Sequence, residues 1–188
     1  MKVPSIFRQA LNDFSRVVGR EYESFEYHYF GSQKPTIAII TMGSSVAVVK
    51  ETLRYIQSEQ ACLIGVRLFR PWLPTDFCKA LPASIKRVAT LDRTKESGAQ
   101  GEPLYMDVCA SLISCNRHEV FVAGGRYGLA SKDFSPRMVL AILNNMMRKG
   151  TESIQHPFTV GIIDDVTNLS LPLGKDVTPL SDEVTQCE

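Results

Sequence analysis

The sequence lacks the cysteine patterns that hold metal ions and clusters. Its 188 residues include five cysteines, none in a C-x-x-C pair and none spaced from a histidine as a structural zinc site requires. The closest two, Cys109 and Cys115, have no further thiol nearby, which argues against iron–sulfur ligation. Cys62, Cys78 and Cys109 lie in apolar stretches, which favours free packed thiols in a reducing compartment.

An excess of charge of one sign is also missing. The chain has 21 basic and 20 acidic residues, a formal net charge of +1, so its charge offers no basis for binding nucleic acid or an anionic membrane. No apolar run is long enough to span a bilayer. Charges interrupt the apolar residues near the N-terminus, so we expect no secretory signal.

What the sequence does have is an alternation of strand and helix patterns. Such alternation predicts βαβ units and, with right-handed crossovers, a doubly wound, mostly parallel, three-layer α/β fold. We divide the chain into an N-terminal helix and extended aromatic segment (1–34), an α/β core (35–163) and a linker or arm (164–188). Helices are expected over 5–18, 46–58, 75–81, 103–114 and 136–150, and strands over 36–40, 62–68, 87–91, 119–123 and 158–163.

Four loops follow predicted strands and should share one edge of the sheet, where such folds bind ligands. The turn 42–45 has one glycine, too few for a dinucleotide fingerprint, and lacks a P-loop lysine. The glycine-rich turn 124–128 carries Arg126 and is an anion cradle, a close-packed turn or a contact with another domain. The long loop 92–102 holds five charges of mixed sign, which suit either an interface or a solvated surface. The fourth loop is 70–72.

The residues on these loops are candidates for contact with other domains or with anions. We expect Arg93 and Arg126 to face other domains, so that alanine at either position barely changes the melting temperature of the chain. Asp164, together with Asp165, could instead bind a cation or act as acid and base, or simply cap the end of a strand. No catalytic residue, metal ligand or cofactor ligand is assigned. The candidates are Arg70, Arg93, Lys95, Glu102, Arg126 and Asp164.

Several motifs in register resemble the second domain of pyruvate:ferredoxin oxidoreductase and of pyruvate:NADP oxidoreductase. The similarity extends from about residue 19 to residue 170. Its motifs are residues 66–71 (VRLFRP), 91–96 (LDRTKE) with Gly98, 101–108 (GEPLYMDV), 124–129 (GGRYGL) with 131–134 (SKDF), 158–162 (FTVGI) and 164–167 (DDVT).

This resemblance implies a multidomain parent enzyme that converts pyruvate and coenzyme A to acetyl-CoA and CO2. Such a parent uses thiamine diphosphate, magnesium and iron–sulfur clusters, is a homodimer, and works in the cytoplasm or an organelle matrix of an anaerobic-type metabolism. The cofactor sites of the family lie in other domains. The resemblance therefore implies that this domain is similar to the C-terminal domain of transketolase, binds no cofactor and is not catalytic alone.

Two other functions remain open at this stage. The chain could be an autonomous domain that binds a nucleotide or another small molecule at its glycine-containing loops. It could also be an oxidoreductase-like domain reused in a sulfite reductase, although the completeness of the motifs argues against a degenerate copy. The identity of the electron acceptor, whether ferredoxin, flavodoxin or NADP, is not encoded in this segment.

Overall fold

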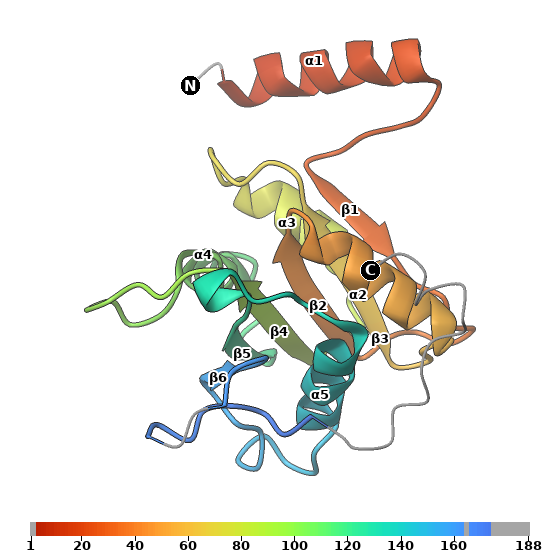
Figure 1. Ribbon diagram of the computed structural model, residues 1–188. Helices are drawn as coiled ribbons and strands as arrows, with labels where there is room; N and C mark the ends of the chain where they lie inside the picture. Colours follow the sequence, from red (N-terminus) through yellow and green to blue (C-terminus); the bar gives the residue numbers. More distant parts are fainter. Residues whose placement is uncertain (1–2, 164–165, 174–188) are drawn as a thin grey trace.

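Six strands form one sheet in the order β1-β3-β2-β4-β5-β6 in the computed structural model, which describes residues 3–163 and 166–173. Strands β2 to β6 are parallel, and β1 lies antiparallel at the edge against β3. The sheet is thus mostly parallel, as predicted (Figure 1). The strands are β1 (Phe25–His28), β2 (Ile37–Met42), β3 (Ala61–Val66), β4 (Arg87–Asp92), β5 (Phe121–Arg126) and β6 (Phe158–Thr159).

Helices cover both faces of the sheet, which confirms the predicted three-layer α/β architecture. Successive residues of a strand point to opposite faces, so Ile39 packs in the core on one side and Ile40 in the core on the other. Helices α2 (Ser45–Tyr55) and α5 (Pro136–Met146) lie on the first face. Helices α3 (Pro74–Ala80) and α4 (Pro103–Ser114) lie on the second, and a short 3-10 helix spans Leu129–Ser131.

The last crossover departs from the expected handedness. Helix α5 lies on the same face as α2, although β6 extends the sheet in the direction opposite to β3. With parallel strands, the crossover through α5 therefore has the opposite hand to the one through α2, and the right-handed rule fails there. The reason is that α5 covers a part of the sheet that would otherwise be exposed. Val139, Ile142 and Met146 of α5 bury a part of the face that α2 alone leaves open, and β6 has only two residues to constrain the crossover.

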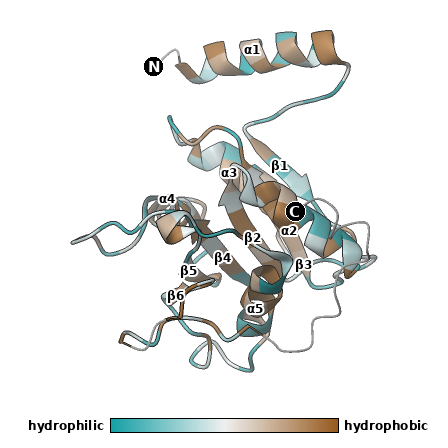
Figure 2. Cartoon of the chain, viewed as in Figure 1, coloured by the Kyte–Doolittle hydropathy of each residue, from teal (hydrophilic) through white to brown (hydrophobic). Residues whose placement is uncertain are grey.

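Helix α1 (Val3–Val18) stands apart from the α/β body (Figures 1 and 2). It covers the predicted helix 5–18 and ends before Gly19, whose φ is +69° and whose amide donates a hydrogen bond to the Ser15 carbonyl oxygen, as is typical of a helix stop. None of its residues is buried. No helix among the described residues is long and apolar enough to cross a membrane.

The segment after β6 contributes to the body. The amide of Thr159 donates to the Leu169 carbonyl oxygen and the amide of Leu171 donates to that of Thr159. Leu171 is buried in the core. The described part of the predicted linker thus lies along the edge of the sheet, while the domain boundary at residue 163 stays a prediction.

One of the three predicted free thiols, Cys78, is cross-linked. Cys78 on α3 and Cys115 after α4 form a disulfide, with their Cα atoms 6.4 Å apart. The expectation of a free thiol at Cys78 is therefore wrong. The two residues are 37 positions apart and meet only because α3 and α4 pack side by side on one face. Cys62 and Cys109 are free, and burial raises the pKa of Cys62 to about 12.

Candidate functional site

The four predicted loops do share one edge of the sheet. They follow β2, β3, β4 and β5, and those strands run parallel. Asp92 and Arg126 are paired in register at the ends of β4 and β5, which confirms that the loop 92–102 and the turn 124–128 lie together. The strand order reverses between β2 and β4, and this reversal marks where a doubly wound sheet opens a ligand crevice.

A tyrosine of the chain itself occupies that crevice. Tyr127 follows β5 and reaches past β4, so that its hydroxyl donates to Ser45 Oγ at 2.9 Å. Ser45 Oγ in turn donates to the Met42 carbonyl oxygen at 3.0 Å and lies 2.6 Å from Thr41 Oγ1. Tyr127, Thr41 and Ser45 are all buried. The reversal point is therefore filled by an internal hydrogen-bonded network.

The N-terminus of α4 is occupied in the same way. The carboxylate of Asp92 accepts hydrogen bonds from the amides of Leu104 at 2.9 Å and Tyr105 at 3.2 Å. These are first-turn donors of the kind that bind phosphate in nucleotide-binding folds. Burial raises the pKa of Asp92. The hydrogen bonds from the two amides stabilise the carboxylate and offset a part of this rise. The chain's own carboxylate thus takes the place of an external anion.

Arg126 and Glu102 form an ion pair inside the edge. Arg126 Nε donates to Glu102 Oε1 at 2.5 Å, and the two side chains are 17% and 7% exposed. Within the described residues these two candidates contact each other, and their predicted contact with other domains or anions stays a prediction. Because both side chains are largely buried, alanine at Arg126 is expected to lower the melting temperature, contrary to the expectation from the sequence.

The paired glycines of β5 allow close packing rather than an anion cradle. A Cβ atom at Gly124 would lie 3.0 Å from Tyr105 Cδ2, and one at Gly125 would overlap the ring of Phe158. Gly128 has a φ of +62°, which glycine adopts without strain. The geometry therefore favours a close-packed turn over an anion cradle at 124–128, and a contact of this turn with another domain stays a prediction.

The remaining candidates lie at the surface of the edge. Arg70 is half-exposed, pairs with Asp107 at 2.6 Å and stacks on Phe69. Arg93 Nε donates to the Gly128 carbonyl oxygen at 3.3 Å, which brings the two loops together. Lys95 is exposed. Their contact with other domains stays a prediction, and Asp164 lies outside the described residues.

His156 joins the edge although sequence reasoning assigned it no role. Its Nδ1 accepts the Gly124 amide proton at 2.9 Å, so the neutral ring carries its own proton on Nε2, 3.2 Å from the Tyr105 hydroxyl oxygen. Burial raises the pKa of Tyr105 to about 12 and lowers the pKa of His156. Both shifts favour the neutral forms of the Tyr105 and His156 side chains, which contact each other. No local pattern in the sequence marks this contact, because His156 and Gly124 are 32 positions apart.

Stability should therefore fall as the pH drops through the titration of His156. A histidine whose folded-state pKa is lowered takes up a proton more readily when unfolded, where its pKa is about 6.5. The contribution is complete above about pH 6.5 and is lost below it. Thermal melts of the chain between pH 8 and pH 5 should show a smaller decline for His156→Gln than for the wild type. The exposed His118, changed to Gln, is the control, and equal declines in all three proteins would contradict the assignment.

Metal ligands do not gather in the described chain. No group of three or more His, Cys, Asp or Glu side chains able to hold a metal ion occurs within residues 3–163 and 166–173. Within the same residues, no buried side-chain nitrogen or oxygen lacks a hydrogen-bond partner. The polar groups of the edge are thus satisfied by one another.

Comparison with known proteins places these features in a family. The family model of pyruvate:ferredoxin oxidoreductase core domain II matches residues 36–139. The pyruvate:ferredoxin oxidoreductase of Moorella thermoacetica is 43% identical over 179 residues, and the probable pyruvate-flavodoxin oxidoreductase of Escherichia coli K12 is 44% identical over 180 residues. The NADP(+) pyruvate dehydrogenase of Cryptosporidium parvum is 38% identical over 190 residues.

These relatives are much longer than the chain. The alignments cover 94%, 92% and 98% of this chain but only 15%, 15% and 10% of the three relatives, respectively. One solved structure, a 2-oxoglutarate:ferredoxin oxidoreductase from Magnetococcus marinus with 2-oxoglutarate, coenzyme A and succinyl-CoA bound, aligns with 77% of this chain and 23% of its own, at a TM-score of 0.47 and 18% identity. The chain thus spans about 15% of the length of the first two relatives.

Proposed function

Because the chain belongs to the pyruvate:ferredoxin oxidoreductase core domain II family, we propose that it is a structural module of a pyruvate oxidoreductase and carries no chemistry of its own. The matched relatives are several times longer than this chain, so it corresponds to one domain of a larger enzyme. In this proposal its task is to pack against other domains of the same polypeptide and to hold them in place.

One observation carries the proposal: the chain's own side chains occupy the ligand-binding edge of the sheet. Asp92 holds the amides at the start of α4, and Tyr127 fills the point where the strand order reverses. A bound phosphate or nucleotide would have to displace both. This arrangement favours the structural module over the autonomous nucleotide-binding domain that the sequence also allowed.

The activity of the complete enzyme is part of the proposal and is supported by the names of the relatives. We propose that the parent oxidises pyruvate with coenzyme A to acetyl-CoA and CO2, and that its thiamine diphosphate, magnesium and iron–sulfur clusters are bound by other domains. A homodimeric parent in the cytoplasm or an organelle matrix belongs to the same proposal. Ferredoxin, flavodoxin and NADP all occur in the names of the relatives, so the acceptor is left open.

The purified chain should bind neither thiamine diphosphate with magnesium nor coenzyme A, and should not decarboxylate pyruvate. Isothermal titration measures the binding, with a nucleotide as a third ligand. The scaffold function predicts no saturable heat, whereas a site of micromolar affinity, equivalent to about 8 kcal/mol, would be readily measured. Stoichiometric binding of any of these ligands would make the chain a cofactor domain and overturn the proposal.

A further inference from the structure

Helix α1 presents a strip of apolar side chains to solvent. Val3, Ile6, Phe14 and Val17 are 48%, 64%, 50% and 84% exposed, and Ala10 lies between them. Spacings of three and four residues place such positions on one side of a helix. Figure 2 shows this helix, with several strongly hydrophobic residues, outside the body of the protein.

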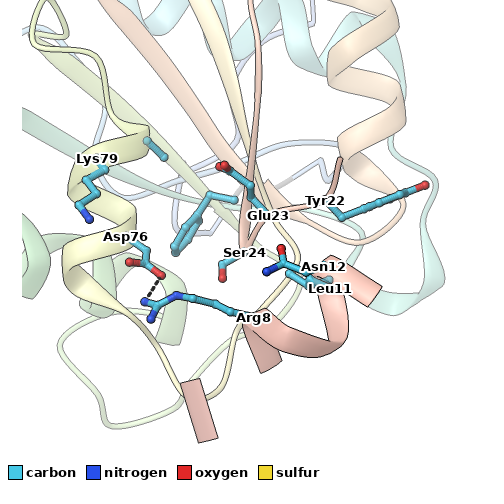
Figure 3. Close-up of a pocket in the computed structure, with 10 residues that line it drawn as sticks. Arg8, Leu11, Asn12, Tyr22, Glu23, Ser24, Asp76 and Lys79 are labelled. Atoms are coloured by element: carbon cyan, nitrogen blue, oxygen red, sulfur yellow. Dashed lines mark hydrogen bonds and ion pairs between the residues drawn. The ribbon is translucent and has the colours of Figure 1, made fainter. Parts of the chain in front are cut away.

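The contact of α1 with the body is sparse. Arg8 pairs with Asp76 of α3 at 2.7 Å, and the Tyr22 amide donates to Ser15 Oγ at 3.1 Å. Phe14 meets the Tyr22 ring at a centroid distance of 5.1 Å. Between α1, α3 and the segment 22–25 lies an open cavity of about 380 Å³, into which the Arg8–Asp76 pair projects (Figure 3). The body therefore covers one edge of the helix and touches the apolar strip only at Phe14, which leaves Val3, Ile6 and Val17 exposed.

A helix of this length needs a packing partner. Helix α1 has 16 residues, little more than the ~12–15 below which isolated helices are marginal in water even when rich in alanine, and most helical stability in proteins comes from burial of the apolar face. The polar side of α1 carries two basic residues, Arg8 and Arg16, while the acidic Asp13, three residues after Ala10 and four before Val17, borders the apolar strip. Helices that lie in a membrane surface are usually rich in lysine and arginine on that side. The composition therefore favours an apolar protein surface as the partner.

Comparison with the long relatives indicates where that surface lies. The alignment with the Cryptosporidium parvum relative covers 98% of the 188 residues and 10% of the relative. The uncovered 2% is about 4 residues, fewer than the 16 residues of α1. Most of the helix is therefore matched inside a polypeptide whose remaining 90% lies outside this domain. A neighbouring domain of the same polypeptide is thus available to cover the strip.

We propose that α1 is a docking helix whose strip of Val3, Ile6, Ala10, Phe14 and Val17 packs on an apolar surface of a neighbouring domain of the same polypeptide. The proposal rests on the proposed function in one respect, because it requires this domain to work inside a longer enzyme. The docking helix adds to the proposed function the element that holds this domain in the longer enzyme. The thin contact between α1 and its own body lets the helix follow that neighbour.

Hydrogen exchange in the complete polypeptide tests the proposal. In the wild type, the amides of α1 should be protected, and Ile6→Lys or Val17→Lys should raise their exchange rates about 10- to 100-fold, because each removes a large apolar side chain from the contact. Gln9→Lys, on the polar side of the same helix, is the matched control and should leave the rates unchanged. The amides of α4 report that the domain itself stays folded in every variant.

Each alternative occupant gives a different result. Freely exchanging α1 amides in the wild-type polypeptide would show that nothing covers the strip, and protection that grows with protein concentration would assign it to a second copy; either result overturns the proposal. An equal rise in the exchange rates of the α1 amides in Gln9→Lys would also overturn it. The rate of pyruvate oxidation by the same wild-type sample separates the two proposals: an active enzyme with unprotected α1 refutes only the docking helix, and an inactive one with protected α1 refutes only the proposed function.

Discussion

Reduction of the Cys78–Cys115 disulfide should lower the free energy of unfolding of the chain by about 4 kcal/mol. The cross-link closes a loop of 37 residues. A cross-link of that length lowers the conformational entropy of the unfolded chain, which is worth about 4 kcal/mol of stability at 25 °C. For a protein of this size the loss corresponds to a fall in melting temperature of about 8–15 °C. Thermal melts with and without a thiol reductant measure it.

The double variant Cys78→Ala/Cys115→Ala is the control for this experiment. It should melt near the temperature of the reduced wild type, and the reductant should not change it further. Cys62 and Cys109 remain as thiols in the variant, so a reductant effect that persists there would come from elsewhere. A wild type that melts at the same temperature in both conditions would show that the cross-link does not stabilise the fold.

Arg126→Ala should destabilise the chain by about 2–4 kcal/mol. The substitution leaves the carboxylate of Glu102 without its partner at a position where only 7% of the side chain is exposed, and an uncompensated buried charge costs about 3–5 kcal/mol before its partial exposure is allowed for. Urea-induced unfolding measures the change. Glu102→Gln combined with Arg126→Ala should recover part of the loss, because the double variant no longer buries a lone charge.

Arg70→Ala supplies the matched control. Arg70 also pairs with a carboxylate, that of Asp107, but its side chain is 54% exposed, and exposed pairs contribute at most about 1 kcal/mol. Its substitution should therefore change the stability far less than that of Arg126. If the two variants lose the same amount, the Glu102–Arg126 pair has no special role in the fold.

The elements were predictable where local signals agreed. Helix α4 begins at Pro103 and ends at Ser114, as predicted, because proline at the first turn and an apolar stripe point to the same bounds. Strand β5 was predicted over 119–123 and is found over Phe121–Arg126. Paired glycines usually indicate a turn, whereas here the rings of Tyr105 and Phe158 fill the space beside Gly124 and Gly125.

The edge was predictable from connectivity, and its pairings were not. Parallel strands bring their carboxyl ends together whatever the side chains are, so the loops 92–102 and 124–128 could be placed without a structure. The partners of each side chain depend on three-dimensional packing. Tyr127 meets Ser45 across 82 positions, and no local pattern marks such a contact. The face chosen by α5 escaped prediction for a related reason, since it depends on which part of the sheet α2 leaves open.

The capping of α4 by Asp92 also has a consequence for how this domain can change. Asp92 ends β4 and holds the amides of Leu104 and Tyr105, so both ends of the loop 92–102 are fixed by contacts that do not involve its middle. Lengthening a loop with anchored ends costs only about 0.6 kcal/mol for each doubling. The stretch 95–100 can therefore accept inserted sequence, natural or engineered, and gain new contacts while the framework beneath it keeps its shape.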